Sequence, residues 1–404
     1  MRVLTLSWEY PPVIEGGLGR HVRKLSEHLV AEGVEVHVLT RGSDHLPRTE
    51  ERHGVVVHRA RWAGGNRFPH DVKAFVRWVE TMNSAMVDLV GELGDAHRFD
   101  VIHSHDWLVA SAARQVVRRC GRPWITTVHA TEYGRHQGWV QNYPQSYIHA
   151  AERDMVTDAD RVITCSRYMR SHVADVFGVP VTKVTAMQNG IDPRDLEPVA
   201  EDLDALRALY AKPGDRLVLL VGRLVYEKGF HLALDALAPV IKTMGNVRFV
   251  IAGTGTAEAE LRRQAWRLGL HRKGVFLGWT GDDMLHSLYR VADLCIVPSI
   301  YEPFGIVALE AMASGCLCIV ADTGGLREVI PDDGTVGLRF PSRDSAALRE
   351  ILERVLDDDA ARAQLIAEAR EHVLRFDWSE VARQTLGVYR RLRAGRPRPA
   401  PAQR

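Results

Sequence analysis

The segment Glu302-Pro303-Phe304-Gly305-Ile306-Val307-Ala308-Leu309-Glu310 carries the most information about the fold of this chain. An apolar run typical of a strand, Ala292–Val297, comes just before it, and the apolar residues that follow the glycine predict a helix over Ile306–Ser314. The segment is therefore a strand–loop–helix turn at the carboxyl end of a strand. Open parallel sheets bind their ligands at this place.

The same segment spaces two carboxylates eight positions apart around a helix start. We expect Glu302 to lie on the loop, free to meet a polar ligand, and Glu310 to lie about a turn and a half inside the helix. Backbone N–H groups at the helix start form an anion site. Carboxylates for hydroxyls and amides for phosphate suit a sugar nucleotide. The alternative is an ordinary helix whose acidic residues complement its dipole.

Length and composition describe a globular protein of two domains. At 404 residues the chain exceeds what one hydrophobic core usually holds. Hydrophobic residues make up 46% and charged residues 25% of it, as in ordinary soluble proteins. Because 52 basic residues stand against 51 acidic ones, the net charge of +1 gives no general attraction to nucleic acid or anionic lipid. We therefore expect no nucleic-acid partner.

The cysteines and the N-terminus indicate a cytoplasmic protein. Five cysteines are an odd number and no C-x-x-C occurs, which favours buried thiols over disulfides or zinc. The apolar run Val3–Leu6 is soon interrupted by Glu9 and lacks a signal-peptide core, and no run reaches the roughly 18 apolar residues of a membrane span. Peripheral membrane contact through a local basic patch stays open, and the sequence sets no oligomeric state.

Short apolar strands alternate with amphipathic helices along the chain, which is typical of doubly wound α/β domains. The first series of expected strands is Arg2–Ser7, Val34–Thr40, Val55–Arg59, Asp100–His105, Trp124–His129, Arg161–Cys165 and Val184–Gln188. The second series is Leu217–Val221, Val247–Ala252, Val275–Leu277, Leu294–Val297 and Cys318–Ala321. Between them Asp192–Pro198, with two prolines, predicts a linker. We expect domains at residues 1–195 and 196–375 and a disordered tail at 393–404.

A glycine-rich loop follows the first strand. Gly16, Gly17 and Gly19 allow positive φ and a close approach of the backbone to a ligand. The loop is no dinucleotide fingerprint, because G-x-G-x-x-G is missing and the strand ended about eight residues earlier. A plain flexible turn is the alternative.

Polar residues also end two later strands of the first domain, in His103-Ser104-His105-Asp106-Trp107 and in Thr127-Val128-His129. Zinc on His103, His105 and His129 is an alternative, but no third ligand stands at helical spacing, and we expect a structural role for His103. Asn189-Gly190 either lines a cleft at the hinge or forms a simple turn.

In the second domain, Arg223 and Lys228 place two cations on one loop after a strand. A departing phosphate carries charge that such cations neutralise. Two D-x-D sequences, at 158–160 and 202–204, fall at a helix end and in the linker region, and we expect no metal site there. Ala252-Gly253-Thr254-Gly255 lacks the third glycine of an NAD site, since Glu258 stands in its place.

Together these motifs resemble glycosyltransferase family 4, whose E-x7-E motif matches Glu302 and Glu310. The resemblance runs in order from Gly16 to Glu328 and is strongest to bacterial glycogen synthase-like and methylglucose lipopolysaccharide α-1,4-glucosyltransferases. It implies an α/β GT-B fold with two Rossmann-like doubly wound domains facing a cleft. It also implies that a last helix, at 376–392, crosses back to the N-terminal domain.

The family resemblance further implies a retaining transfer of glucose from ADP- or UDP-glucose to a glucan or oligosaccharide, without a cofactor or metal. It assigns catalysis to Asp106, His129, Arg223, Lys228 and Glu302. The donor would be bound by Gly16, Gly17, Gly19, Arg223, Lys228, Gly253, Phe304, Gly305, Ile306, Val307 and Glu310, with the base near Phe276–Thr280. The acceptor side of the cleft would be lined by His105, Trp107 and Asn189.

Rival interpretations remain open from the sequence. A family 4 enzyme with another donor, such as GDP-mannose or UDP-N-acetylglucosamine, would share most of these loops. A non-catalytic sugar-nucleotide-binding protein would keep the fold. A pyridoxal-phosphate-dependent glucan phosphorylase is disfavoured, because its motif is missing and the chain is too short.

Overall fold

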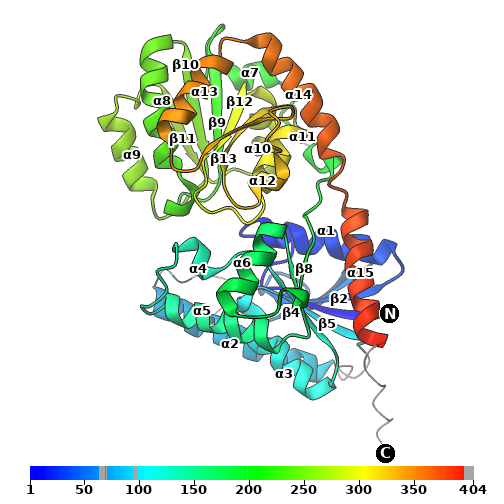
Figure 1. Ribbon diagram of the computed structural model, residues 1–404. Helices are drawn as coiled ribbons and strands as arrows, with labels where there is room; N and C mark the ends of the chain where they lie inside the picture. Colours follow the sequence, from blue (N-terminus) through cyan, green and yellow to red (C-terminus); the bar gives the residue numbers. More distant parts are fainter. Residues whose placement is uncertain (63–68, 70, 94–98, 198, 395–404) are drawn as a thin grey trace, which may run out of the picture. The chain divides into compact units, whose positions relative to one another are not determined.

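The strands of the chain form two sheets, one in each of two α/β units, and most of the strands in each sheet run parallel (Figure 1). The structure is a computed structural model and describes residues 1–62, 69, 71–93, 99–197 and 199–394. One unit comprises Met1–Asn189 together with the segment that begins at Trp378, and the other comprises Gly190–Asp377. The two-domain α/β class expected from the sequence is confirmed.

The N-terminal unit contains an eight-stranded sheet in the order β3-β4-β2-β1-β5-β6-β7-β8. Its neighbouring strands are parallel, except that β3 runs antiparallel to β4. In the register of β1 with β2, Val3 lies opposite Val36. The strands are β1 (Arg2–Leu6), β2 (Glu35–Arg41), β3 (Thr49–Arg52), β4 (Val55–Ala60), β5 (Val101–His105), β6 (Trp124–Val128), β7 (Arg161–Thr164) and β8 (Val184–Ala186).

Helices connect these strands, and the last helix of the chain returns to this unit. They are α1 (Gly17–Ala31), α2 (Val72–Glu92), α3 (Ala110–Cys120), α4 (Glu132–Arg135), α5 (Gln145–Asp158), α6 (Arg167–Phe177) and α15 (Trp378–Ala394). α15 packs beside α1 (Figure 1) and buries Trp378, Leu386 and Tyr389 in the core of the N-terminal unit. The expected return of the last helix is thus confirmed.

The C-terminal unit has a six-stranded parallel sheet in the order β11-β10-β9-β12-β13-β14. Apolar residues from both faces of the sheet are buried under helices, as parallel strands require. The strands are β9 (Arg216–Val221), β10 (Val247–Ala252), β11 (Gly274–Gly278), β12 (Leu294–Val297), β13 (Leu317–Asp322) and β14 (Leu338–Pro341). The helices are α7 (Leu203–Ala208), α8 (Phe230–Met244), α9 (Glu258–Arg267), α10 (Asp282–Val291), α11 (Ile306–Ala313), α12 (Leu326–Val329), α13 (Ser345–Val355) and α14 (Asp359–Val373).

The strand orders locate the place where each sheet binds ligands. From β1 the chain first builds the sheet toward β2 and β4, and then resumes on the other side of β1 with β5. In the same way β9 lies between β10 and β12. At such reversals the loops after the two central strands diverge and leave a crevice at their carboxyl ends. These are the loops after β1 and β5 in one unit, and after β9 and β12 in the other.

The structure also corrects some expectations from the sequence. The edge strands β3 and β14 were not expected, and Arg393 and Ala394 still belong to α15. The remainder of the expected tail, residues 395–404, lies outside the described residues. The short 3-10 helix Pro193–Leu196 and buried Leu196 occupy most of the expected linker and lie in the C-terminal unit.

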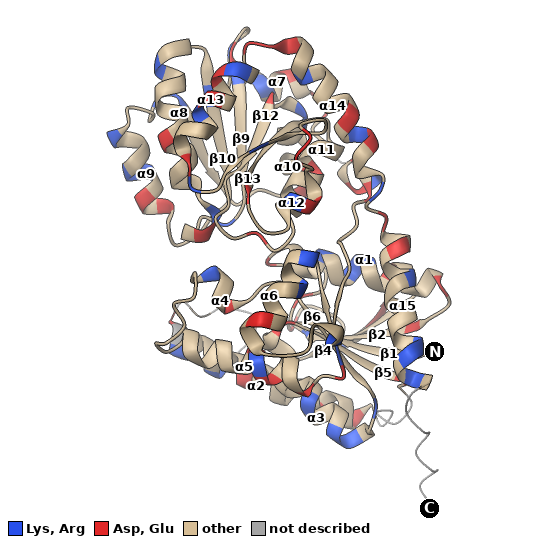
Figure 2. Ribbon diagram, in the orientation of Figure 1, with Lys and Arg blue, Asp and Glu red and all other residues tan. Residues whose placement is uncertain are grey.

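Charge and apolar patterning agree with the composition. Lys and Arg are interspersed with Asp and Glu along the helices of both units (Figure 2). All five cysteines are buried and unbridged. Within the described part of the chain, no helix combines the length and the apolar character needed to cross a membrane.

Candidate active site

Two loops at the reversal point of the C-terminal sheet bring Lys228 and Glu302 together. Lys228 ends the short 3-10 helix Tyr226–Lys228 after β9, and its Nζ donates to Glu302 Oε2 over 2.7 Å. The loops are joined along the backbone as well, because the amides of Ile300 and Tyr301 donate to the Glu227 carbonyl at 2.8 and 3.3 Å. The ion pair thus lies on a backbone that is itself fixed.

Glu302 is not free on its loop, contrary to the expectation from the sequence. Its side chain is 12% exposed, and Oε2 accepts a hydrogen bond of 2.9 Å from Ser299 Oγ as well as the one from Lys228. A carboxylate that keeps two donors is held in one orientation. Any ligand hydroxyl that meets Glu302 therefore meets a positioned acceptor.

Arg223 lies on the same loop as Lys228 but is much more exposed. Its side chain is 58% exposed, and Nη2 lies 3.7 Å from Glu227 Oε1. An ion pair of this kind at the surface contributes little to stability. More than half of this side chain is accessible to an approaching anionic ligand.

At two positions in the loops that follow the strands of this sheet, the backbone conformation requires a glycine. Gly253, after β10, has φ +140°, and a Cβ there would lie 1.9 Å from the Gly222 carbonyl oxygen. Gly305 has φ +123° and directly precedes α11, where a Cβ would lie 2.6 Å from Leu326 Cδ2. A side chain at position 253 would collide with the backbone of Gly222, and one at position 305 would collide with Leu326 and be strained by the positive φ.

Helix α11 begins at the crevice and carries the second carboxylate inside it. Ile306 and Val307 are its first residues, so their amides belong to the turn whose N–H groups have no partner within the helix. Glu310 is buried, and its Oε2 accepts a hydrogen bond of 3.1 Å from the hydroxyl of Tyr289 on α10. Phe304 is 2% exposed and packs edge-on against Phe376, so this residue offers a ligand its backbone alone.

In the N-terminal unit, the glycine-rich loop is held by a buried carboxylate. Glu9 Oε2 accepts hydrogen bonds from the amides of Glu15 and Gly16, at 2.8 and 3.0 Å. Burial raises the pKa of Glu9, while these amides and Arg41 oppose the rise. These hydrogen bonds hold the start of the loop against Glu9.

The glycines of this loop serve a different purpose from the one expected. Gly16 is extended at φ −174°, and none of Gly16, Gly17 and Gly19 has positive φ. A Cβ on Gly19 would lie 3.1 Å from Glu9 Cβ and Oε2. Close packing of α1 against Glu9 is therefore what requires a glycine at position 19.

Asp106 directly follows β5 in a conformation that is rare for residues other than glycine, with φ +60°. Its Oδ1 accepts a hydrogen bond of 2.7 Å from the backbone amide of His129. Burial raises the pKa of Asp106 to about 6, although the Arg135 guanidinium and the amides of His129 and Ala130 lower it. Such strain and a shifted pKa together are characteristic of functional sites.

Three histidines of the same unit lie close to one another. His105 Nδ1 and His129 Nε2 lie 3.0 Å apart. His21, on α1, joins them with its ring centre 4.6 Å from that of His129, and its Nδ1 lies 2.9 Å from Asn189 Oδ1. Burial lowers the pKa of His129 to about 3, so the imidazole is neutral near pH 7.

The remaining predicted residues of this unit are enclosed. His103 is fully buried, and its two ring nitrogens lie 2.7 Å from the Tyr389 hydroxyl and from Thr127 Oγ1, in agreement with a structural role. Trp107 is 7% exposed and packs against Phe75. Asn189 is also buried, and its described contact is with His21.

Sequence reasoning missed several residues at these sites. They are Glu9, His21, Tyr289 and Ser299; Trp279, 77% exposed immediately after β11, lies within the range Phe276–Thr280 expected for the base but was not singled out. An exposed tryptophan at a strand's carboxyl end is a detectable signal, and so is a serine three residues before Glu302. The partners of Glu9, His21 and Tyr289 depend on packing between elements, which no local pattern encodes.

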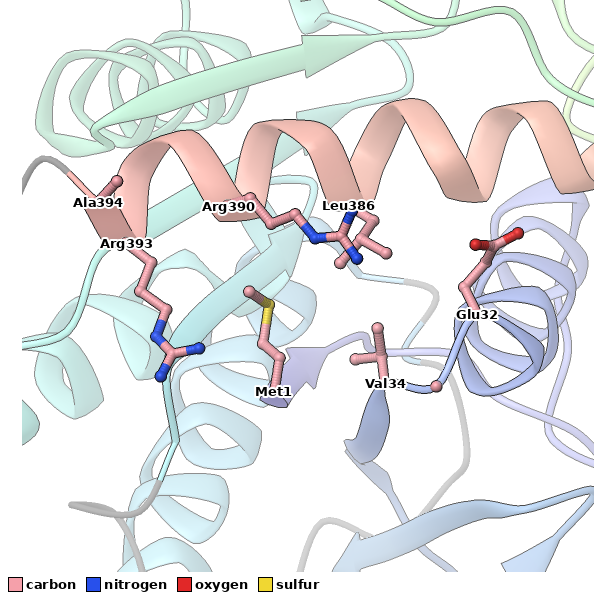
Figure 3. Close-up of a pocket in the computed structure, with 8 residues that line it drawn as sticks. Met1, Glu32, Val34, Leu386, Arg390, Arg393 and Ala394 are labelled. Carbon is pink, nitrogen blue, oxygen red and sulfur yellow. The ribbon is translucent and has the colours of Figure 1, made fainter.

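A pocket of about 500 Å³ lies on the N-terminal unit, away from these loops (Figure 3). Its walls include Met1, Val34, Leu386, Arg390 and Arg393. Because β1 and β2 begin at Arg2 and Glu35, this pocket is at the amino ends of the strands. It therefore lies at the edge of the sheet where ligands of this fold class do not bind.

Comparison with known proteins places the chain in a family. A family model described as Glycosyltransferase Family 4 matches residues 15–195, and one described as Glycosyl transferases group 1 matches residues 204–372. An uncharacterized glycosyltransferase of Methanocaldococcus jannaschii is 35% identical, over 96% of this chain and 98% of its own length. A glycogen synthase of Mycobacterium tuberculosis is 38% identical, over 99% of this chain and 97% of its own length.

A solved structure shows the same two-domain architecture. The sucrose-phosphate synthase of Thermosynechococcus elongatus is 25% identical and superimposes with a TM-score of 0.82, over 98% of this chain and 100% of its own. The matched segments together span the loops around Asp106, Lys228 and Glu302. The chain therefore belongs to glycosyltransferase family 4 and is a hexosyltransferase with the GT-B fold.

Proposed function

We propose that this enzyme transfers glucose from ADP-glucose or UDP-glucose to an α-1,4-glucan, of the glycogen or methylglucose lipopolysaccharide type, with retention and without a metal. The observation that carries the proposal is the Lys228–Glu302 pair, 2.7 Å apart beside the start of α11. The cation and the helix N-terminus suit the diphosphate of a sugar nucleotide, and the positioned carboxylate suits its sugar hydroxyls. The 38% identity to a glycogen synthase supports glucose and a glucan.

The C-terminal unit binds the donor in this proposal. Lys228, the exposed guanidinium of Arg223 and the amides of Ile306 and Val307 neutralise the diphosphate, and the turns at Gly253 and Gly305 give it room. In a metal-independent enzyme, these groups do the work that a divalent cation does elsewhere.

The nucleoside is bound by neighbouring residues of the same unit. Glu310, oriented by the Tyr289 hydroxyl, accepts hydrogen bonds from the ribose hydroxyls. Trp279 offers a flat, exposed ring at the end of β11, on which a nucleobase stacks. Stacking tolerates either base, so it fits both ADP- and UDP-glucose.

The transferred glucose is held by Asp106, His129 and Glu302. Double displacement would need a free carboxylate nucleophile with a second carboxyl about 5–5.5 Å away. Glu302 is instead hydrogen-bonded to Lys228 and Ser299, and the family resemblance assigns it to the sugar hydroxyls. The same resemblance implies that the acceptor attacks from the face that the diphosphate leaves, and that the departing phosphate oxygen takes the acceptor proton.

The test is release of nucleoside diphosphate from ADP-glucose, UDP-glucose, GDP-mannose and UDP-N-acetylglucosamine, each with and without maltohexaose and with EDTA present. Turnover that needs both a glucose donor and maltohexaose is expected. Turnover with another donor alone would overturn the glucose assignment and favour the alternative family 4 activity. Binding of nucleotide sugars without turnover on any acceptor would favour a non-catalytic sugar-nucleotide-binding protein.

A further inference from the structure

Three histidines from separate elements of the N-terminal unit converge on one point. His21 comes from α1, His105 ends β5 and His129 follows β6. One ring nitrogen from each lies within 4.8 Å of the others. His103, which the sequence offered as a ligand, is excluded because both its ring nitrogens are engaged by Tyr389 and Thr127.

The spacing of these rings is close to that of a metal site. Tetrahedral zinc with imidazole ligands at 2.0–2.1 Å holds the ligand nitrogens about 3.3–3.4 Å apart. His105 Nδ1 and His129 Nε2 are already at 3.0 Å, and the His21 ring stands edge-on to His129 with 4.6 Å between ring centres. The three ligand nitrogens, all within 4.8 Å of one another, would have to draw closer to bind one ion.

An outer partner orients His21 for coordination. The Nδ1 atom of His21 lies 2.9 Å from the side-chain amide oxygen of Asn189. Because that oxygen can only accept a hydrogen bond, Nδ1 carries the hydrogen and Nε2 keeps its lone pair. Nε2 is buried and has no hydrogen-bond partner in the described part of the chain. Metal-binding histidines are typically fixed in this way by an acceptor on the second nitrogen. A bound cation would satisfy a nitrogen that burial otherwise penalises.

Two charged groups lie close to the histidine cluster. The carboxylate of Asp106, bonded to the amide of His129, adds a negative charge nearby. Arg135 opposes this with a positive charge close to His129.

We propose that His21, His105 and His129 form a binding site for one divalent transition-metal ion that prefers nitrogen ligands, such as Zn²⁺. Three protein ligands leave the fourth position to water or another oxygen. A consequence rests on the proposed function: because His129 would otherwise contact the transferred glucose, the ion inhibits transfer. The site is thus inhibitory, and the reaction itself needs no metal.

Binding is tested by calorimetric titration of the untagged full-length protein with Zn²⁺. The wild type is expected to bind one equivalent at this site. Asn189→Ala, which removes the outer partner of His21, weakens binding roughly 10- to 100-fold, and His21→Ala weakens it further. His28→Ala is the matched control, because His28 lies two turns further along α1, outside the cluster. The affinity of this variant for Zn²⁺ is expected to equal that of the wild type. Equal Zn²⁺ binding by wild type and His21→Ala would overturn the proposal.

Co²⁺ supplies a readout that does not depend on activity or on the folding of a variant. The wild-type protein with Co²⁺ is expected to show the intense visible absorption of a four-coordinate site, which Asn189→Ala alters and His28→Ala does not. A weak six-coordinate spectrum would overturn the site. If the spectrum appears but Zn²⁺ leaves transfer unaffected, the site stands and the placement of His129 at the glucose is wrong.

Discussion

Replacing Lys228 by methionine removes the charge of the Lys228–Glu302 pair while keeping most of the side-chain volume. Glu302 then retains Ser299 as a donor but loses its cation. The diphosphate of the donor loses the same cation. One substitution therefore perturbs both stability and catalysis, and the two effects are separable.

The expected magnitudes follow from the burial of the pair. Side-chain exposures of 21% for Lys228 and 12% for Glu302 place it between surface pairs, worth about 0–1 kcal/mol, and buried pairs, whose disruption costs about 3–5 kcal/mol. We expect Lys228→Met to destabilise the C-terminal unit by about 2 kcal/mol. Loss of one electrostatic contact to the departing diphosphate should lower kcat by roughly 100- to 1000-fold.

The assay is a double-mutant cycle with Lys228→Met, Glu302→Gln and the double variant, each measured by urea unfolding and by steady-state turnover. Removing both charges leaves no unpaired ion, so the double variant should recover at least about 1 kcal/mol relative to the sum of the single variants. Its activity should stay as low as that of Lys228→Met.

Two results would refute this reasoning. Additive losses of stability would mean that the ion pair contributes no coupling. Turnover within about threefold of the wild type in Lys228→Met would remove Lys228 from the stabilisation of the diphosphate, whatever the stability data show.

Three further changes have expected outcomes. Tyr289→Phe removes the hydrogen bond to Glu310 and should weaken nucleoside diphosphate binding roughly 2- to 10-fold by calorimetry. Unchanged affinity would contradict the proposed binding of the ribose by Glu310. Gly305→Ala, at φ +123°, should lower the unfolding free energy by about 1–3 kcal/mol in urea titrations, and an unaltered midpoint would contradict the strain. Burial lowers the pKa of His58 to about 4, so its contribution to stability is complete above pH 6.5 and is lost as pH falls toward 4. The advantage of the wild type over His58→Gln should therefore shrink by at most about 1.4 kcal/mol per pH unit in that window, whereas a constant difference would contradict the shift.

The sequence could predict much of the C-terminal site because the signals there are local. The apolar runs that end at Val221 and Val297 fix two strand ends, and Arg223, Lys228 and Glu302 follow them directly. Parallel strands present their carboxyl ends at one edge of a sheet. The residues of the two loops could therefore be grouped before the pairing of their strands was known.

What escaped prediction depends on contacts between distant parts of the chain. Lys228 meets Glu302 because β9 and β12 are adjacent strands of the sheet. No local sequence pattern encodes which strands are adjacent. Strand alternation correctly placed His103 and His105 together, with ring centres 4.4 Å apart. It could not reveal that the hydroxyl of Tyr389, 286 residues later, is hydrogen-bonded to a ring nitrogen of His103.

The edge strands were missed for a related reason. β3 has the sequence Thr-Glu-Glu-Arg, without a buried apolar face, and β14 ends in a proline that a central strand would exclude. Both pair with a single neighbour at the edge of their sheets. Their conformation comes from that neighbour and not from their own residues.

The most direct test of the central claim is proton NMR of the product formed from ADP-glucose or UDP-glucose and maltohexaose. The account predicts a chain lengthened by glucose through a new α-1,4 linkage, formed with EDTA present and reduced at least about 100-fold in Lys228→Met. A β-linked product would contradict retention and same-face attack. Absence of any lengthened product with both donors would contradict the assignment of glucan glucosyl transfer.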